Sequence, residues 1–265
     1  MTSEDKDNYL PFRPPAEQHT GKKVLALGSA RLPLEEEEAR EEIRRMAEIT
    51  RLSYAELEDM RIIHPGMRQV PALNVFRELR TKLYQLAAGR DNFVLLVTSI
   101  SPGGGASFIT MNLGAAIALD ESKTAIVVDC NVYDPSLQNI LPLDPDFGLA
   151  DYLENVSLEL KDVIYSTGVR RLRIIPAGSR RQPGIEFFTS SRMRRLVHEL
   201  RSRYRDRYVI MDAPSIGTSA DARILSEMCD YVLLVVPHGG VTEAQVQASI
   251  AAIPEGKLAG VVFNS

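Results

Sequence analysis

From residue 93 onward, short β-branched runs alternate with longer stretches of helical periodicity. This alternation is typical of βαβ units, whose parallel strands are buried between helices on both faces of a sheet. With right-handed crossovers it predicts an α/β fold with a doubly wound, mostly parallel sheet, and a ligand site at the carboxyl ends of the strands. The expected strands are Phe93 to Thr98, Ala125 to Asp129, Leu172 to Ile175, Tyr208 to Asp212, Tyr231 to Val236 and Leu258 to Phe263, each buried on both faces.

The residues before this region predict a helical extension rather than a second domain. Residues 1–33 are rich in polar residues and proline, and we expect a disordered or loosely attached tail. Residues 34–90 contain two stretches of helical periodicity, Leu34 to Ile49 and Ala72 to Ala88, and the α/β domain then covers 91–265. On the second helix the pattern predicts one buried face, made by Val75, Leu79, Leu83 and Leu86.

Composition excludes several classes of function. A formal net charge of -4 gives no bulk attraction to nucleic acid. The apolar runs are far shorter than the roughly 20 residues of a membrane span, and the polar N-terminus does not resemble a signal peptide, so no transmembrane segment and a cytoplasmic location are predicted. Cys130 and Cys229 lack metal or redox spacing and are interpreted as core residues, and the four histidines show no ligand spacing.

A glycine-rich segment follows the first expected strand. It runs from Ser99 to Phe108 (SISPGGGASF) and leads into a helix expected over Ile109 to Leu119. Consecutive glycines let backbone N–H groups surround an anion, and the helix N-terminus adds a partial positive charge. The segment therefore predicts a phosphate-binding loop, with an ordinary βα loop as the alternative. The candidate cofactor-binding residues are Pro102, Gly103, Gly104, Gly105, Ala106, Ser107 and Phe108.

Two aspartates lie where later strands end. Asp129 and Asp212 each follow an apolar run directly, so both should face the same crevice. Two carboxylates beside the hydroxyl of Ser107 suit Mg²⁺, which prefers oxygen ligands. We therefore predict these three residues as metal ligands, and the two aspartates as the catalytic candidates if the chain has activity. A strand-end cap is the alternative for each aspartate.

Taken together, the motifs resemble those of the bacterial tyrosine autokinases of capsule and exopolysaccharide loci. The resemblance runs from about Leu57 to Asn264. It rests on FRELRTKL, TSISPGGGASF, VVDCNVYDPSL, GLADYL, LRIIPAG, VIMDAPS, SADARILSEMCDYVLLVV and GVVFN. The resemblance implies a P-loop fold of the MinD/ParA type, binding of ATP or ADP with Mg²⁺, and autophosphorylation on a C-terminal tyrosine cluster. It also implies oligomeric assembly and a membrane polysaccharide co-polymerase as partner, which could recruit the chain to the inner membrane.

The chain departs from that family pattern at chemically important positions. Ala106 stands where the family has the loop lysine, and Gly104 where it usually has glutamate. A lysine about 4 Å from a phosphate charge contributes on the order of a few kcal/mol at an effective dielectric constant of about 20, and it stabilises charge in the transition state. In the second motif Asn131 replaces an aspartate and Tyr133 a basic residue. These changes predict weak nucleotide binding and poor phosphoryl transfer.

Two further departures concern assembly and the phosphoacceptor. No tyrosine cluster follows the last expected strand, so we expect the family's own acceptor to be missing. The family's helical glutamate–arginine motif reads Asn74, Arg77 and Arg80 here. The two arginines remain candidates for an oligomer contact, either in a homo-oligomer or with a different subunit that supplies the missing acid.

Twelve arginines lie between Arg170 and Arg207. A solvated amphipathic helix is the favoured interpretation, because MRRLVHEL has a clear apolar face. The alternatives are contact with the acidic stretch Glu35 to Glu42 of a neighbouring subunit, with the inner membrane surface, or with a membrane partner.

The leading functional hypothesis is a degenerate kinase that regulates or partners a polysaccharide co-polymerase. A second is an active kinase or ATPase that takes its missing cation from an arginine, for which Arg77 and Arg80 are candidates. A third is a MinD- or ParA-like positioning ATPase, which normally needs a lysine-rich loop. The fourth is a structural adaptor that binds no nucleotide.

Overall fold

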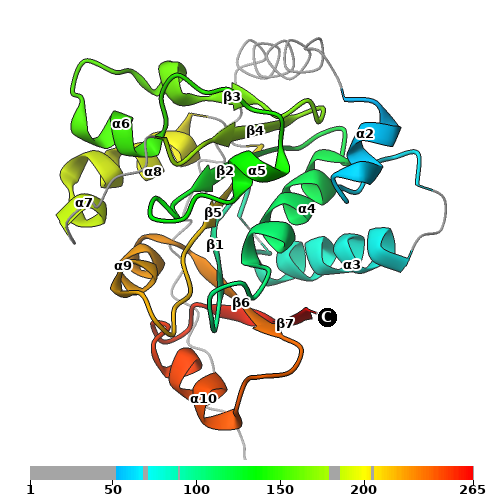
Figure 1. The fold of residues 1–265 in the computed structure, drawn as a ribbon, viewed down its shortest axis with the longest axis vertical. Coiled ribbons are helices and arrows are strands. Elements are labelled where there is room, and N and C mark those ends of the chain that lie inside the picture. Colours follow the sequence, from blue (N-terminus) through cyan, green and yellow to red (C-terminus); the bar gives the residue numbers. More distant parts are fainter. Residues whose placement is uncertain (1–51, 68–70, 89, 179–185, 204–205, 265) are drawn as a thin grey trace, which may run out of the picture.

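A computed structural model describes residues 52–67, 71–88, 90–178, 186–203 and 206–264 (Figure 1). The expected tail and the expected helix Leu34 to Ile49 lie outside the described residues. A seven-stranded sheet forms the centre, in the order β3-β4-β2-β5-β1-β6-β7. Its strands are β1 Val94–Ser99, β2 Thr124–Asp129, β3 Tyr165–Ser166, β4 Leu172–Ile175, β5 Arg207–Asp212, β6 Tyr231–Pro237 and β7 Leu258–Asn264.

The sheet confirms the predicted fold class. All neighbouring strands pair in parallel except β3, which pairs antiparallel with β4. The six expected strands are all present, and the two-residue β3 was not predicted because it is too short to show a pattern. β1, β2 and β5 are buried along their whole length, whereas β7 is only half-buried. The expectation of burial on both faces is therefore wrong for β7, because it is an edge strand.

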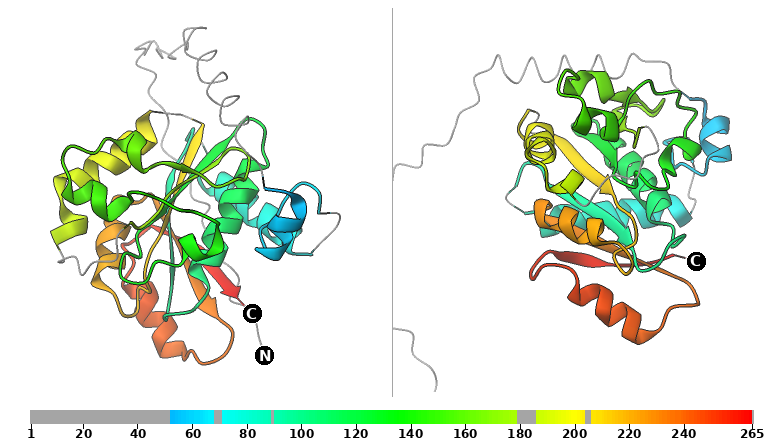
Figure 2. Two further views of the ribbon diagram at one scale, coloured as in Figure 1. Left: turned by 45° about the horizontal axis from the view of Figure 1, so that its top comes forward. Right: turned by 60° about the vertical axis from the view of Figure 1, so that its left-hand side comes forward.

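Helices cover both faces of the sheet (Figures 1 and 2). One apolar layer joins the sheet to α2, α3, α4 and α5, and the other joins it to α6, α7, α8 and α9. The bounds are α2 Tyr54–Asp59, α3 Pro71–Leu86, α4 Ala106–Ala118, α5 Leu137–Ile140, α6 Leu149–Glu154, α7 Glu186–Thr189, α8 Ser191–Ser202, α9 Ala220–Met228 and α10 Glu243–Ala251, with a 3₁₀ turn at Leu160–Val163.

The buried face of α3 differs from the prediction. Leu73, Phe76 and Leu83 are buried, whereas Val75 is 59% exposed and Leu86 is 47% exposed. Only Leu83 of the four predicted residues is fully buried. The reason lies in the packing against α4, where the Phe76 ring meets the Phe108 ring edge to face at 6.2 Å. A large aromatic residue thus determines the rotation of the helix, which the leucine spacing alone did not reveal.

α8 carries much of the arginine-rich segment. Ser190 caps the helix by accepting from the Met193 amide at 3.1 Å, and Met193, Leu196, Val197 and Leu200 are buried. The arginines Arg194, Arg195 and Arg201 lie exposed on the other side. α8 is thus the amphipathic surface helix that the pattern predicted. None of the helices in the described ranges is long and apolar enough to cross a membrane.

Candidate functional site

The glycine loop connects β1 to α4, as predicted. Gly103 and Gly105 have φ angles of +72° and +87°, a left-handed conformation that side-chain-bearing residues rarely adopt. Gly105 is the N-cap of α4, so the first-turn amides of the helix begin immediately after the loop. Inside the turn, Ser99 Oγ donates to the Ser101 carbonyl at 2.7 Å. The chain therefore presents a helix N-terminus behind a tight glycine turn, which is a geometry that binds anions.

Asp129 and Asp212 lie side by side at the carboxyl edge of the sheet. They are direct partners in the register of β2 and β5, and the side chains of both are fully buried. Neighbouring strands are roughly 4.8 Å apart, so the two carboxylates belong to one site. The structure brings together the two acids that the sequence predicted as metal ligands.

Hydroxyl groups converge on Asp212. Ser107 Oγ donates to Asp212 Oδ2 at 2.6 Å, and Thr110 Oγ1 donates to Asp212 Oδ1 at 3.1 Å. Ser136 Oγ donates in turn to Ser107 Oγ at 2.6 Å. The third predicted ligand, Ser107, is thus in direct contact with one of the two carboxylates.

Asp129 is less well satisfied. Its Oδ1 accepts from the Asn131 amide at 3.0 Å, and the Leu137 amide also favours its charged form, but no hydrogen bond of good geometry reaches its buried Oδ2 from the described residues. A buried carboxylate oxygen without a partner is costly. Mg²⁺ binds such oxygens, so the residues present fit this cation.

Burial and mutual repulsion alter the acidity of this pair. Burial and the Asp212 charge raise the pKa of Asp129 well above its ordinary value. Burial also raises the pKa of Asp212, to about 7, although the hydrogen bonds from Ser107 and Thr110 oppose the shift. Two carboxylates that resist ionisation together are stabilised by a bound cation. Protons and a metal ion would therefore compete for this site near neutral pH.

The end of β7 contacts the glycine loop. Asn264 Nδ2 donates to the Gly104 carbonyl at 3.2 Å. A Cβ atom at Gly105 would collide with the same Asn264 amide group. The left-handed backbone conformation thus favours glycine at Gly105, and a side chain there would also displace the Asn264 amide group.

The predicted loop residues do not all contribute in the same way. Pro102 and Gly103 are exposed at the turn, and Gly104 is buried. Ala106 is the first residue of α4 and is 7% exposed, so a buried methyl group lies at the start of the helix. The ring of Phe108 packs against Phe76, so any contribution of Phe108 to phosphate binding falls to its backbone amide.

The two arginines of α3 lie in different environments. Arg77 is exposed. Arg80 Nη1 donates to the Ala116 carbonyl in the last turn of α4 at 2.8 Å, and its guanidinium lies 6.0 Å from the ring centroid of Tyr84. Arg80 thus interacts with the end of α4 opposite to Ser107, about 14 Å away along the helix axis.

Sequence reasoning missed several residues of the site. Thr110 follows Ser107 by one helical turn and so faces the same carboxylate, which the spacing could have indicated. Asn264 ends a strand at the same edge as the aspartates, which is a weaker signal. Ser136 gave no signal, because only the folded course of the loop after β2 brings it to Ser107.

The fold and the site define a class of protein. A parallel sheet, a glycine turn at a helix N-terminus, and two strand-end acids beside a serine are features of the P-loop fold, in which Ala106 here replaces the loop lysine. Cys130 and Cys229 are both buried free thiols, as expected for core residues. In the described segments no cluster of three or more His, Cys, Asp or Glu side chains could hold a metal. A metal here would depend on the two acids and hydroxyl or phosphate oxygens.

Among characterised proteins, the chain is similar to bacterial tyrosine-protein kinases. It is 27% identical to the tyrosine-protein kinase wzc of Salmonella typhimurium over 239 residues, which are 89% of this chain and 32% of wzc. It is 24% identical to the tyrosine-protein kinase CpsD of Streptococcus agalactiae, over 77% of this chain and 88% of CpsD. It is 25% identical to the succinoglycan biosynthesis transport protein ExoP of Rhizobium meliloti, over 71% of this chain and 24% of ExoP. No protein-family model matches the chain.

Solved structures of kinase domains share the fold. The chimerical protein CapA2B2 superposes with a TM-score of 0.70 at 25% identity, covering 86% of this chain and 98% of that structure. The kinase domain of the Escherichia coli tyrosine kinase ETK gives a TM-score of 0.68 at 24% identity, over 81% of this chain and 88% of that domain. A ParA family ATPase from Chlorobium tepidum is more distant, with a TM-score of 0.52 at 18% identity, over 65% of this chain and 73% of that structure.

Proposed function

We propose that this protein is a tyrosine-kinase-like P-loop protein of exopolysaccharide biosynthesis. In this proposal it binds a magnesium nucleotide weakly, has lost efficient phosphoryl transfer, and regulates or partners a membrane polysaccharide co-polymerase. The similarity to wzc and ExoP supports the polysaccharide context. The chain matches about a third of wzc and a quarter of ExoP, and the membrane partner is an inference from the transport role in ExoP's name.

The observation that carries the proposal is the contrast between Asp129, Asp212 and Ser107 on one side and Ala106 on the other. The proximity of the two carboxylates and the hydroxyl supports a magnesium site, and a bound metal would neutralise phosphate charge. Ala106 offers no ammonium group to the phosphates. In this proposal the chain keeps the residues for metal-dependent nucleotide binding but lacks the residue that stabilises the transition state.

The alternative of an active kinase that borrows a cation from α3 receives little support from the geometry. The Arg80 guanidinium is bound to the Ala116 carbonyl at the far end of α4. Arg77 is exposed, and among the described residues no hydrogen bond joins its side chain to the glycine loop.

Calorimetric titration of the full chain with ATP, with and without Mg²⁺, tests this function when combined with a phosphotyrosine assay. We expect magnesium-dependent binding with a dissociation constant above micromolar, and no autophosphorylation. Robust autophosphorylation by the purified chain would refute the degenerate-kinase proposal. The absence of any nucleotide binding would favour the structural adaptor.

A further inference from the structure

Two of the tyrosines in the described ranges have exposed side chains, Tyr54 at 53% and Tyr133 at 40%. The other described tyrosines, Tyr84, Tyr152, Tyr165, Tyr208 and Tyr231, are buried or half-buried. Only an exposed tyrosine can enter the active site of another protein. The two exposed rings therefore invite a comparison of what each hydroxyl and ring contacts.

Tyr133 differs from Tyr54 in the group that its hydroxyl contacts. The Tyr133 hydroxyl is hydrogen-bonded to the carboxylate of Asp221 in the first turn of α9. Tyr54 instead stacks its ring on His64, with the ring centroids 4.5 Å apart. A carboxylate in contact with a phenolic hydroxyl is placed to accept its proton. Asp221 is 5% exposed, and its burial raises the pKa of its carboxyl group, which makes it a better proton acceptor than a solvated aspartate.

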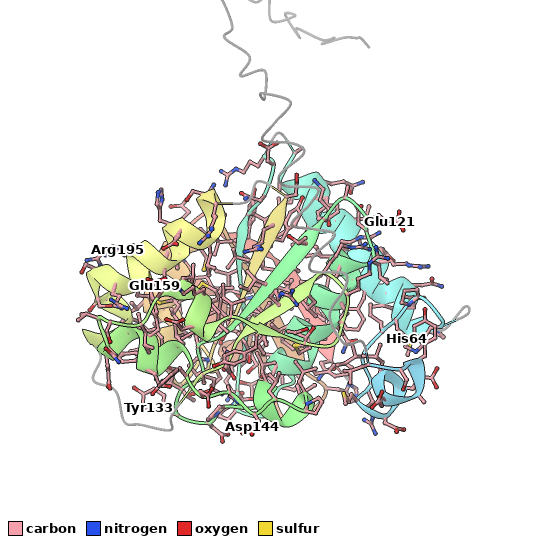
Figure 3. The ribbon with its side chains drawn as sticks, turned by 90° about the horizontal axis from the view of Figure 1, so that it is seen from above. His64, Glu121, Tyr133, Asp144, Glu159 and Arg195 are labelled. Atoms are coloured by element: carbon pink, nitrogen blue, oxygen red, sulfur yellow. The ribbon has the colours of Figure 1, made fainter. Side chains whose placement is uncertain are left out.

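The position of Tyr133 in the fold adds to this difference. It lies in the loop between β2 and α5, four residues after Asp129 and three before Ser136, whose hydroxyl binds Ser107. Figure 3 shows Tyr133 at the outer edge of the molecule, along the same lower edge as Asp144. The tyrosine is thus accessible from outside while its loop is attached to the phosphate-binding segment.

We propose that Tyr133 is a phosphoryl acceptor of this chain and that Asp221 is the base that receives its proton. The donor is a magnesium nucleoside triphosphate held by a tyrosine kinase that retains the loop lysine. Tyr133 Oη forms a bond to the terminal phosphorus, the bond from that phosphorus to the bridging oxygen breaks, and the nucleoside diphosphate leaves. The phenolic proton passes to the Asp221 carboxylate and then to solvent.

The modification has a structural consequence at the same loop. A phosphotyrosine carries about -1.5 to -2 charges at neutral pH, and here it would stand beside Asp221 and close to Asp134 in sequence. Repulsion replaces the Tyr133–Asp221 hydrogen bond, and the loop that delivers Ser136 to Ser107 is displaced. Phosphorylation at this position therefore weakens the arrangement around the metal site.

The test uses the full chain, the kinase domain of E. coli ETK and Mg·ATP, with the phosphorylated residue located by peptide mass spectrometry. We expect phosphate mainly on Tyr133 and at least a tenfold loss of incorporation in Tyr133→Phe. Tyr54→Phe is the matched control and should incorporate phosphate like the unaltered chain, because phenylalanine preserves the stacking on His64. No phosphate, or phosphate on other residues with Tyr133 unmodified, would overturn the proposal.

A second pair of variants isolates the role of Asp221. Asp221→Asn keeps a hydrogen-bond acceptor but removes the base, and we expect at least a tenfold lower rate of incorporation. Asp144→Asn removes an exposed charge outside the loop that joins β2 to α5, and its rate should stay within twofold of the original. Equal rates in the two variants would refute the role of Asp221. Incorporation at Tyr133 without added kinase would support the acceptor and refute the proposed loss of transfer activity instead.

Discussion

The two sides of the predicted phosphate site differ in how many of the side chains expected for nucleotide binding they contain. On the β2 and β5 side, Asp129 and Asp212 are buried partners, and Ser107 contacts Asp212 at 2.6 Å. On the glycine-loop side, the backbone turn is formed but Ala106 supplies only a methyl group. Under the proposed function, metal coordination and charge stabilisation on the transferring phosphate would depend on separate residues, so one could persist while the other is lost.

The largest expected effect comes from removing a carboxylate. Asp212→Ala deletes a candidate metal ligand and leaves the Ser107 and Thr110 hydroxyls without their acceptor. We expect the gain in ATP affinity produced by Mg²⁺ to fall roughly 100-fold, or about 3 kcal/mol, as for the loss of a charge-assisted interaction in a buried site. Calorimetric titration with and without Mg²⁺ measures this gain. Glu121→Ala, which removes an exposed acid beyond the far end of α4, is the control, and an equal loss in both variants would contradict the assignment.

Restoring the lysine should produce a somewhat smaller change in the opposite direction. Ala106→Lys adds the missing ammonium group, and we expect nucleotide to bind about 30-fold more tightly, or about 2 kcal/mol. Ala106→Met is the matched control, because it adds a chain of similar length without charge. If the lysine and methionine variants bind nucleotide equally, the missing charge does not limit nucleotide affinity. The contrast drawn between the glycine-loop side and the carboxylate side would then be wrong.

The pH dependence of stability tests the carboxylate side without nucleotide. The folded-state pKa of Asp212 is raised to about 7, so between about pH 4 and 7 the folded chain binds more protons than the unfolded chain. The free energy of unfolding should therefore fall as pH rises through this range. Between pH 6 and 8 in EDTA, we expect the chain to lose about 1–2 kcal/mol more than Asp212→Asn does. Denaturant titration at both pH values measures the difference. Identical losses in the unaltered chain and in Asp212→Asn would show that folding does not raise the pKa of Asp212.

The smallest effect concerns α3. Arg80→Gln should destabilise the fold by about 1 kcal/mol through loss of the bond to the Ala116 carbonyl, while nucleotide affinity stays within twofold. Chemical denaturation and calorimetry together check this outcome. Arg77→Gln, which lies exposed on the same helix, is the control for lost charge. A large drop in nucleotide affinity in Arg80→Gln alone would revive the idea that α3 supplies the cation.

Much of the fold could be predicted from sequence because buried parallel strands are continuous apolar runs, and the strand-end aspartates follow from that pattern. The rotation of α3 could not, because it depends on how Phe76 meets Phe108. At the site, the acids and the glycine turn were predictable from their positions in the βα units. Ser136 and Asp221 were not, because loop geometry alone brings them to Ser107 and Tyr133.

The central claim is tested most directly by measuring nucleotide binding and turnover on the same preparation of the full chain. The account predicts that Mg²⁺ strengthens ATP binding, while hydrolysis and tyrosine phosphorylation stay at background, and that Ala106→Lys raises turnover above that background. Turnover by the unaltered chain at the rate of an ordinary kinase, on the order of 1 per second or faster, would contradict it.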